Sequence, residues 1–246
     1  DPRVRVITGS VPMPQRRGYV PNPAGVSQLG GDVLVTLHHA RAEYSGMDES
    51  ELVAVSIEEP RVRYRLPLQG LKDCGRAELS PSRAVLAVAC SAYVDRLGAV
   101  AEPETSGLLL LDATTDPPQE LRRFLATELV GEPMQGSIEF VTERLALFKT
   151  QTALGSEQDN QLYSLDLETG EATLLASAAR NKNGLGFGIA FGGMSCRTGC
   201  GDPCLVADRS RGKLLRFELE GDTLAPAADV VIEGAGLPPA GVTPFW

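Results

Sequence analysis

Four short apolar runs of the same form recur along the chain, and turn residues follow each of them. They are ELVAVSI at 51–57, GLLLLDA at 107–113, QLYSLDL at 161–167 and KLLRFEL at 213–219. The leucines at 52, 108, 162 and 214 are separated by 56, 54 and 52 residues. A self-similar pattern with a period of about fifty residues indicates a repeat protein, in which one supersecondary unit recurs.

Each run belongs to a larger unit of four predicted strands. Two shorter apolar segments precede every run, and a turn and a return strand follow it, most clearly in DLETGEATLL at 166–175. The preceding segments lie at 24–29 and 32–38, 75–80 and 84–90, 136–141 and 144–150, and 187–192 and 204–210. Antiparallel four-stranded units at this period are typical of β-propeller blades. The pattern therefore predicts an all-β fold, a β-propeller of four-stranded antiparallel blades, with units at 24–70, 71–130, 131–180 and 181–235.

The two ends of the chain and one internal segment leave alternatives open. Residues 236–246 look like the start of a further blade, and PRVRVITG at 2–9 looks like a strand that closes a ring. We therefore expect the natural chain to be longer. QELRRFLATE at 119–128 is expected as the fourth strand of its unit, with a short helix as the alternative. A two-sheet sandwich is the rival fold, but it predicts cleaner alternation and no fifty-residue repeat.

This pattern resembles the bacterial secreted β-propellers of the broad lactonase-like, surface-layer-like group. The resemblance covers most of residues 24–246 and rests on the blade repeat and on turns such as DLETGE. That group includes lactone hydrolases, substrate-binding modules and scaffolds, so the resemblance implies a fold and not one activity. Lactonases of the group gather acidic and asparagine ligands around a central cation. The resemblance therefore implies a calcium alternative, with these candidate ligands: Glu139, Asn181, Asn183 and Asp208.

Two cysteines flank a predicted hairpin. Cys74 and Cys90 each lie eight residues from Ser82, so a turn about Ser82 places them directly opposite each other. Opposed residues in an antiparallel pair are close enough for a disulfide. The other interpretation is a pair of buried free thiols that act as small hydrophobic residues.

The other three cysteines lie in SCRTGCGDPC at 195–204. Cys196, Cys200 and Cys204 have no histidine nearby, and their spacing does not match four-ligand zinc sites, iron–sulfur clusters or C-x-x-C redox motifs. A loop disulfide is expected, and each of the three pairings stays open. The leftover cysteine is free to pair with a segment outside this chain. Since disulfides persist outside the cytoplasm, we expect a periplasmic, cell-surface or secreted protein.

Composition and charge exclude some function classes. The net charge of −9 repels a phosphate backbone, so no nucleic-acid partner is expected. No apolar run approaches the ~18 residues that a transmembrane helix needs. The 19 arginines against 4 lysines suggest a GC-rich bacterial genome.

The two histidines, His38 and His39, are neighbours in a predicted strand. Neighbouring side chains of a strand point to opposite faces, so the two cannot share one metal ion there. One of them could serve as a general base in the channel. The other interpretation is a hydrogen-bonded histidine at a strand end. The sequence holds none of the common hydrolase motifs.

Three long connections fall at the same point of three successive units. They are HARAEYSGMDESE at 39–51, YVDRLGAVAEPETSG at 93–107 and QTALGSEQDN at 151–160. We expect all three to emerge on one face and to form a binding surface. Its candidate residues are Tyr44, Asp48, Glu49, Tyr93, Asp95, Glu102, Glu104, Glu157 and Asp159.

The sequence thus predicts a non-catalytic extracytoplasmic binding or scaffold module. Its partner would be a protein or a surface polymer, and no cofactor is expected. The alternative is a calcium-dependent, lactonase-like hydrolase with a site in the central channel.

Overall fold

The structure is a computed structural model, and it describes residues 10–95, 99–150, 159–178, 190–196 and 204–231. These residues form four antiparallel sheets, with a few short helical turns between strands. The predicted all-β fold of four-stranded antiparallel sheets is therefore confirmed.

The strands of each sheet pair in the order in which they occur in the chain. Sheet 1 contains β1 (Val20–Leu29), β2 (Asp32–Ala40), β3 (Met47–Ser56) and β4 (Val62–Pro67). Sheet 2 contains β5 (Glu78–Leu79), β6 (Val85–Ser91), β7 (Ser106–Asp112) and β8 (Gln119–Leu125). Sheet 3 contains β9 (Met134–Phe140), β10 (Leu145–Thr150), β11 (Asn160–Asp166) and β12 (Ala172–Ala178). Sheet 4 contains β13 (Phe191–Cys196), β14 (Cys204–Asp208), β15 (Lys213–Glu220) and β16 (Thr223–Pro226), and β17 (Val230–Val231) pairs with β15.

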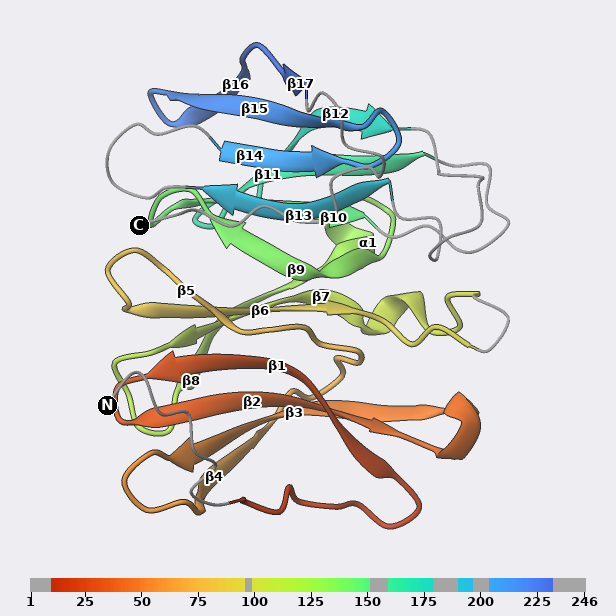
Figure 1. Cartoon of the computed structure of the whole chain (residues 1–246), viewed down its shortest axis with the longest axis vertical. Coiled ribbons are helices and arrows are strands. Elements are labelled where there is room, and N and C mark those ends of the chain that lie inside the picture. The colour runs from red at the N-terminus through yellow and green to blue at the C-terminus, as the bar shows by residue number, and fades with distance from the viewer. Residues whose placement is uncertain (1–9, 96–98, 151–158, 179–189, 197–203, 232–246) are drawn as a thin grey trace.

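The sheets stack face to face, from sheet 1 at the bottom of Figure 1 to sheet 4 at the top. The repeat leucines of the first three units, Leu52, Leu108 and Leu162, have no exposed surface. Each belongs to a different apolar cluster, and the three clusters fill the spaces between successive sheets. Inner strands are therefore apolar at consecutive positions because both of their faces are covered.

A polar residue precedes each of these leucines by two positions and bonds to the next sheet. The bonds are Cys74 N–H to Ser50 Oγ at 3.1 Å, Met134 N–H to Ser106 Oγ at 2.9 Å and Ala190 N–H to Asn160 Oδ1 at 2.6 Å. The three acceptor residues are buried. Each bond satisfies a backbone donor at or just before the first strand of the next sheet, where two sheets meet. The repeat thus encodes a polar contact between neighbouring sheets as well as an apolar one.

Two inner segments of sheets 2 and 3 approach each other at the backbone. A Cβ at Gly75 would lie 1.6 Å from the carbonyl oxygen of Gly136. No side chain fits at that distance, so glycine at this position permits the close packing of the two segments.

The segment at 119–128 is a strand for most of its length. β8 occupies 119–125, and a four-residue helix, α1 (Ala126–Leu129), follows it. The strand prediction is confirmed there, and the helix alternative holds for the last turn alone.

The described first strand of sheet 4 extends beyond the predicted segment, 187–192. β13 occupies Phe191–Cys196, and residues 187–189 lie outside the described residues. Gly192 and Gly193 interrupt the apolar pattern and look like a strand end. In the structure the register shifts between Phe191 and Met194, and the strand continues to Cys196. The predicted end segments, 2–9 and 236–246, lie outside the described residues.

Candidate functional site

The long connections between the second and third strands of sheets 1 and 2 emerge at one end of the sheets, on the right in Figure 1, whereas most of the third predicted connection, residues 151–158, lies outside the described residues. We call this end the loop face. In sheet 1 the connection contains the 3₁₀ turn η1 (Ala42–Tyr44), and in sheet 2 it contains η2 (Pro103–Thr105). The turns between the first and second strands of sheets 1 to 3 lie at the opposite end, which we call the turn end.

Hydrogen bonds hold the loop face in shape. The Tyr93 hydroxyl donates to the carbonyl oxygen of Tyr44 at 2.6 Å and so joins the loops of sheets 1 and 2. The Arg41 N–H donates to the Gly46 carbonyl at 2.8 Å and closes the first loop on itself. These contacts give the two loops a defined conformation before any partner binds.

Several of the predicted binding residues are engaged within the molecule. Asp48 pairs with Arg16 at 2.7 Å, and Glu102 pairs with Lys72 at 2.5 Å. Burial alone would raise the pKa of Asp48, but the hydrogen bond from Arg16 holds it below its ordinary value. These carboxylates stabilise the loops, and their charges are already matched.

The remaining candidates divide into engaged and exposed residues. Glu49 accepts the Gly70 N–H, Asp95 accepts the Ala99 N–H, and Tyr93 is 7% exposed and packs with Ala40 and Met47. Among the predicted binding residues, the exposed side chains are those of Tyr44, Glu104 and Asp159, whereas Glu157 lies outside the described residues.

A central cavity of about 910 Å³ opens at the turn end. Its walls come from β1, β5, β9 and β13 and from the turns beside them, so all four sheets contribute. Lys149 of β10 also lines it. A volume of this size is within the range of small-molecule sites in proteins.

Glu139 and Lys149 lie in the wall of the cavity and both reach from sheet 3 to β13. Glu139 Oε1 accepts the Cys196 N–H at 3.0 Å, and Lys149 Nζ donates to the Gly192 carbonyl at 2.5 Å. Burial raises the pKa of Glu139 to about 7 and lowers the pKa of Lys149 to about 8. In both cases the charged form is disfavoured because it is removed from water.

The calcium candidates are not brought together. Glu139 meets β13 at Cys196, whereas Asp208 pairs with Phe191. Five residues of strand separate these points by about 16 Å. Asn181 and Asn183 lie outside the described residues, and within the described ranges no three His, Cys, Asp or Glu residues are placed to hold a metal ion.

Asp208 has a local structural role. Its Oδ1 accepts the backbone N–H groups of Ser210 and Arg211, each at 3.0 Å. It therefore caps the tight turn between β14 and β15, on the loop face.

Two disulfides join segments that are adjacent in sheets 2 and 4, and Cys74 lies just before β5 and pairs with Cys90 of β6 in an isolated β-bridge. Cys74–Cys90 is the bridge predicted from the hairpin of sheet 2, and it is confirmed. Cys196–Cys204 is one of the three pairings left open, and it joins β13 to β14. Cys200 lies outside the described residues.

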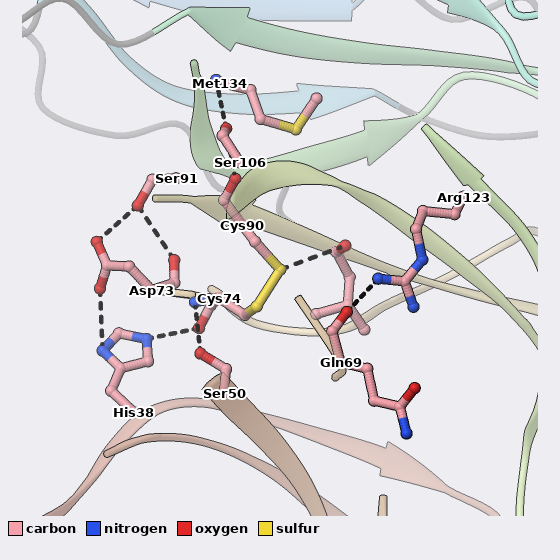
Figure 2. Close-up of a disulfide and its surroundings, with 11 residues drawn as sticks. His38, Ser50, Gln69, Asp73, Cys74, Cys90, Ser91, Ser106, Arg123 and Met134 are labelled. Atoms are coloured by element: carbon pink, nitrogen blue, oxygen red, sulfur yellow. Dashed lines mark hydrogen bonds and ion pairs between the residues drawn. A yellow bond between two sulfur atoms is a disulfide. The ribbon is translucent and has the colours of Figure 1, made fainter. Parts of the chain in front are cut away.

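The Cys74–Cys90 bridge is surrounded by a polar network that spans three sheets (Figure 2). His38 Nε2–H donates to the Cys74 carbonyl at 2.7 Å, and His38 Nδ1 lies 3.1 Å from Asp73 Oδ1. The Ser91 hydroxyl donates to Asp73 Oδ2 at 2.6 Å. This serine points at the carboxylate and not at the imidazole, so the group lacks the serine–histidine contact of a hydrolase. Both ring nitrogens of His38 are engaged, which leaves none for general-base catalysis.

His39 points to the opposite face of β2 and is completely buried. Its Nε2 contacts Glu51 Oε2 at 3.1 Å, and Arg65 Nε donates to Glu51 Oε1 at 2.6 Å. Burial lowers the pKa of His39 more than Glu51 raises it. Burial alone would raise the pKa of Glu51, but Arg65 and His39 hold it below its ordinary value. This set stabilises sheet 1 and does not face the channel.

Sequence reasoning missed Lys149 and the polar residues between sheets. Lys149 is a lone charge inside the apolar run LALFKT, and that contrast was a usable signal. Ser50, Ser106 and Asn160 each stand two positions before a repeat leucine, so aligning the repeats would have found them.

No family model and no curated protein matches the chain. Solved structures do match at low identity. A hypothetical selenium-binding protein from Sulfolobus tokodaii is 10% identical, with a TM-score of 0.53 over 88% of this chain and 51% of that one. The β-propeller domain of the trilobed protease from Pyrococcus furiosus is 13% identical, with a TM-score of 0.43 over 86% of this chain and 59% of that one. A putative 6-phosphogluconolactonase from Bacteroides fragilis is 13% identical, with a TM-score of 0.45 over 92% of this chain and 59% of that one.

The chain spans 51 to 59% of the lengths of these three structures. At 10% identity the likeness to the Sulfolobus protein shows the fold alone. The four-stranded antiparallel sheets, each with its strands in chain order and stacked face to face, have the architecture of a β-propeller. Among the described helices of the chain none has the length and apolar character to cross a membrane.

Proposed function

We propose that this chain is a non-catalytic, extracytoplasmic binding module that holds a protein or surface-polymer partner on its loop face. The observation that carries the proposal is the shaped loop pair of sheets 1 and 2, joined by the bond from Tyr93 to Tyr44. Loops that are ordered in advance lose less conformational entropy when a partner binds.

Tyr44 is the anchor that this proposal assigns. Its side chain is 53% exposed on the loop face. Glu43 and Tyr44 have φ angles of 60° and 53°, in the left-handed region that non-glycine residues seldom adopt. Strained backbone of this kind is concentrated at binding and switch sites, and exposed tyrosines are frequent hot spots of interfaces. The exposed carboxylates of Glu104 and Asp159 favour a partner with a basic contact surface.

The extracytoplasmic location is supported by the two disulfides. Cys196–Cys204 links two neighbouring strands and Cys74–Cys90 links a strand to the segment before β5, and such bonds persist in oxidising compartments.

Photo-crosslinking in the cells that produce the protein tests the proposal. A photoreactive amino acid replaces Tyr44 in one variant and Leu121, an exposed residue of the outer strand β8, in the control. We expect a defined crosslinked species from position 44 and none from position 121. The same species from both positions, or none from position 44, would contradict binding at the loop face.

The calcium-dependent hydrolase is a second candidate, favoured by one observation. Glu139 is a half-buried carboxylate in the wall of the central cavity, and burial raises its pKa to about 7. Elemental analysis for calcium, together with lactone turnover before and after chelation, separates this candidate from a binding module. Calcium at one ion per chain with turnover that chelators abolish would support the hydrolase.

A further inference from the structure

Lys149 is a charged side chain in the wall of the central cavity and is 4% exposed. It extends from β10 toward β13, where its ammonium donates to the Gly192 carbonyl. Among the described residues no carboxylate pairs with it. An ammonium group removed from water without a counter-ion costs several kcal/mol, so such a group calls for an anion beside it.

The other charges of the cavity are paired, half-buried or exposed to solvent: Arg83 is exposed at its rim, where water screens its charge. Arg76 pairs with Glu78 at 2.6 Å, and Arg83 donates to the Gln28 carbonyl at 3.0 Å. Glu139 accepts the Cys196 N–H. Because burial raises its pKa to about 7, Glu139 adds less than one full negative charge near neutral pH. Among the described lining residues, Lys149 is therefore the positive charge that is both buried and without a carboxylate partner.

The walls of the cavity also include apolar surface, contributed among others by Val26 and Met194. A site with one buried, unpaired positive charge and partly apolar walls suits an anion with a single charge and an apolar body. An inorganic phosphate would bring more charge than the site can match and nothing to place against the apolar walls.

We propose that the central cavity binds a small organic monocarboxylate, whose carboxylate lies against the Lys149 ammonium. The site is at the turn end of the molecule, away from the loop face, and it does not depend on the function proposed for that face.

The pH response follows from the same side chain. Burial lowers the pKa of Lys149 to about 8, so the ammonium is present at pH 7 and largely lost at pH 9. The charged or titratable groups that share the cavity with it are Glu139, Glu78, Arg76 and Arg83. Ionisation of Glu139 on the way to pH 9 weakens anion binding in the same direction. Binding is therefore expected to be about tenfold weaker at pH 9 than at pH 7.

Isothermal titration of hexanoate into the full chain at pH 7 tests the proposal. Hexanamide is the neutral probe of similar shape, and inorganic phosphate is the alternative anion. Lys149→Met removes the charge and keeps much of the side-chain volume. Lys213→Met is the matched control, because Lys213 pairs with Asp229 outside the cavity.

We expect hexanoate to bind the parent protein and the Lys213→Met variant equally, and to bind Lys149→Met at least tenfold more weakly. Hexanamide and phosphate should bind far more weakly than hexanoate. The proposal is overturned if Lys149→Met binds hexanoate with the affinity of the parent protein. It is also overturned if hexanamide or phosphate binds with the affinity of hexanoate, or if hexanoate does not bind. Should Lys149→Met fail to fold, titrations of the parent protein at pH 7 and pH 9 decide, and equal affinity at both pH values would overturn it.

Discussion

Replacing Ser106 with alanine removes a hydrogen-bonding group from the interface between sheets 2 and 3. The Ser106 hydroxyl donates to the Cys90 carbonyl at 2.8 Å and accepts the Met134 N–H at 2.9 Å (Figure 2). Ser106 has no exposed surface, so water cannot take the place of its hydroxyl. An unsatisfied buried donor or acceptor costs about 1–3 kcal/mol. Two groups lose their partner here, and we expect the free energy of unfolding to fall by about 2–3 kcal/mol.

Urea unfolding at 25 °C under oxidising conditions measures this change. A lower midpoint with an unchanged slope indicates a loss of stability without a change in compactness. Ser106→Thr keeps a hydroxyl and should recover part of the loss. Ser45→Ala is the control, since Ser45 is exposed and bonds within its own loop, and it should change stability by less than about 0.5 kcal/mol. Equal midpoints for Ser106→Ala and the parent protein would refute the role of this contact between sheets.

Three further predictions concern stability. Replacing Cys74 and Cys90 together with serine removes a bridge between residues 16 apart. It should lower the free energy of unfolding by about 3 kcal/mol in the chain-entropy model, and reductant should lower the melting temperature of the parent protein alike. The pKa of His39 and that of Glu51 are both below their ordinary values in the fold, so stability should fall as the pH drops below about 6.5 and again below about 4.5. In His39→Gln, the fall in stability below about pH 6.5 should disappear when unfolding is measured against pH. An unchanged profile would contradict the assignment of this fall to His39. Lys149→Met should raise stability at pH 7 by up to about 3 kcal/mol, and in the parent protein stability should rise between pH 8 and 10.5 because the unfolded chain then holds more protons. A lower melting temperature for this variant would contradict the burial of an uncompensated charge.

The fold could be predicted because the apolar segments recur with a period of about fifty residues in the sequence. Leu52, Leu108 and Leu162 fill the spaces between sheets, and a repeat that buries one residue at the same place in each unit keeps that residue apolar. The Cys74–Cys90 bridge was predictable for a similar reason, since it depends on the register of one local hairpin.

The state of individual side chains could not be predicted in the same way. Asp48 and Glu102 look like free surface charges in the sequence, but partners far along the chain, Arg16 and Lys72, pair with them in the fold. The environment of Lys149 depends on β13, which lies more than forty residues further along the chain. Such contacts between sheets are set by packing and leave no local pattern.

The most direct test of the proposed function is the affinity of the purified protein for the species that crosslinks from position 44. The measurement compares the parent protein, Tyr44→Ala and the control Leu121→Ala. Loss of an anchoring tyrosine costs about 1–2 kcal/mol, so Tyr44→Ala should bind roughly tenfold more weakly, with an unchanged melting temperature. Leu121→Ala should bind as the parent does. Equal affinity for Tyr44→Ala and the parent protein would contradict the loop face as the binding surface.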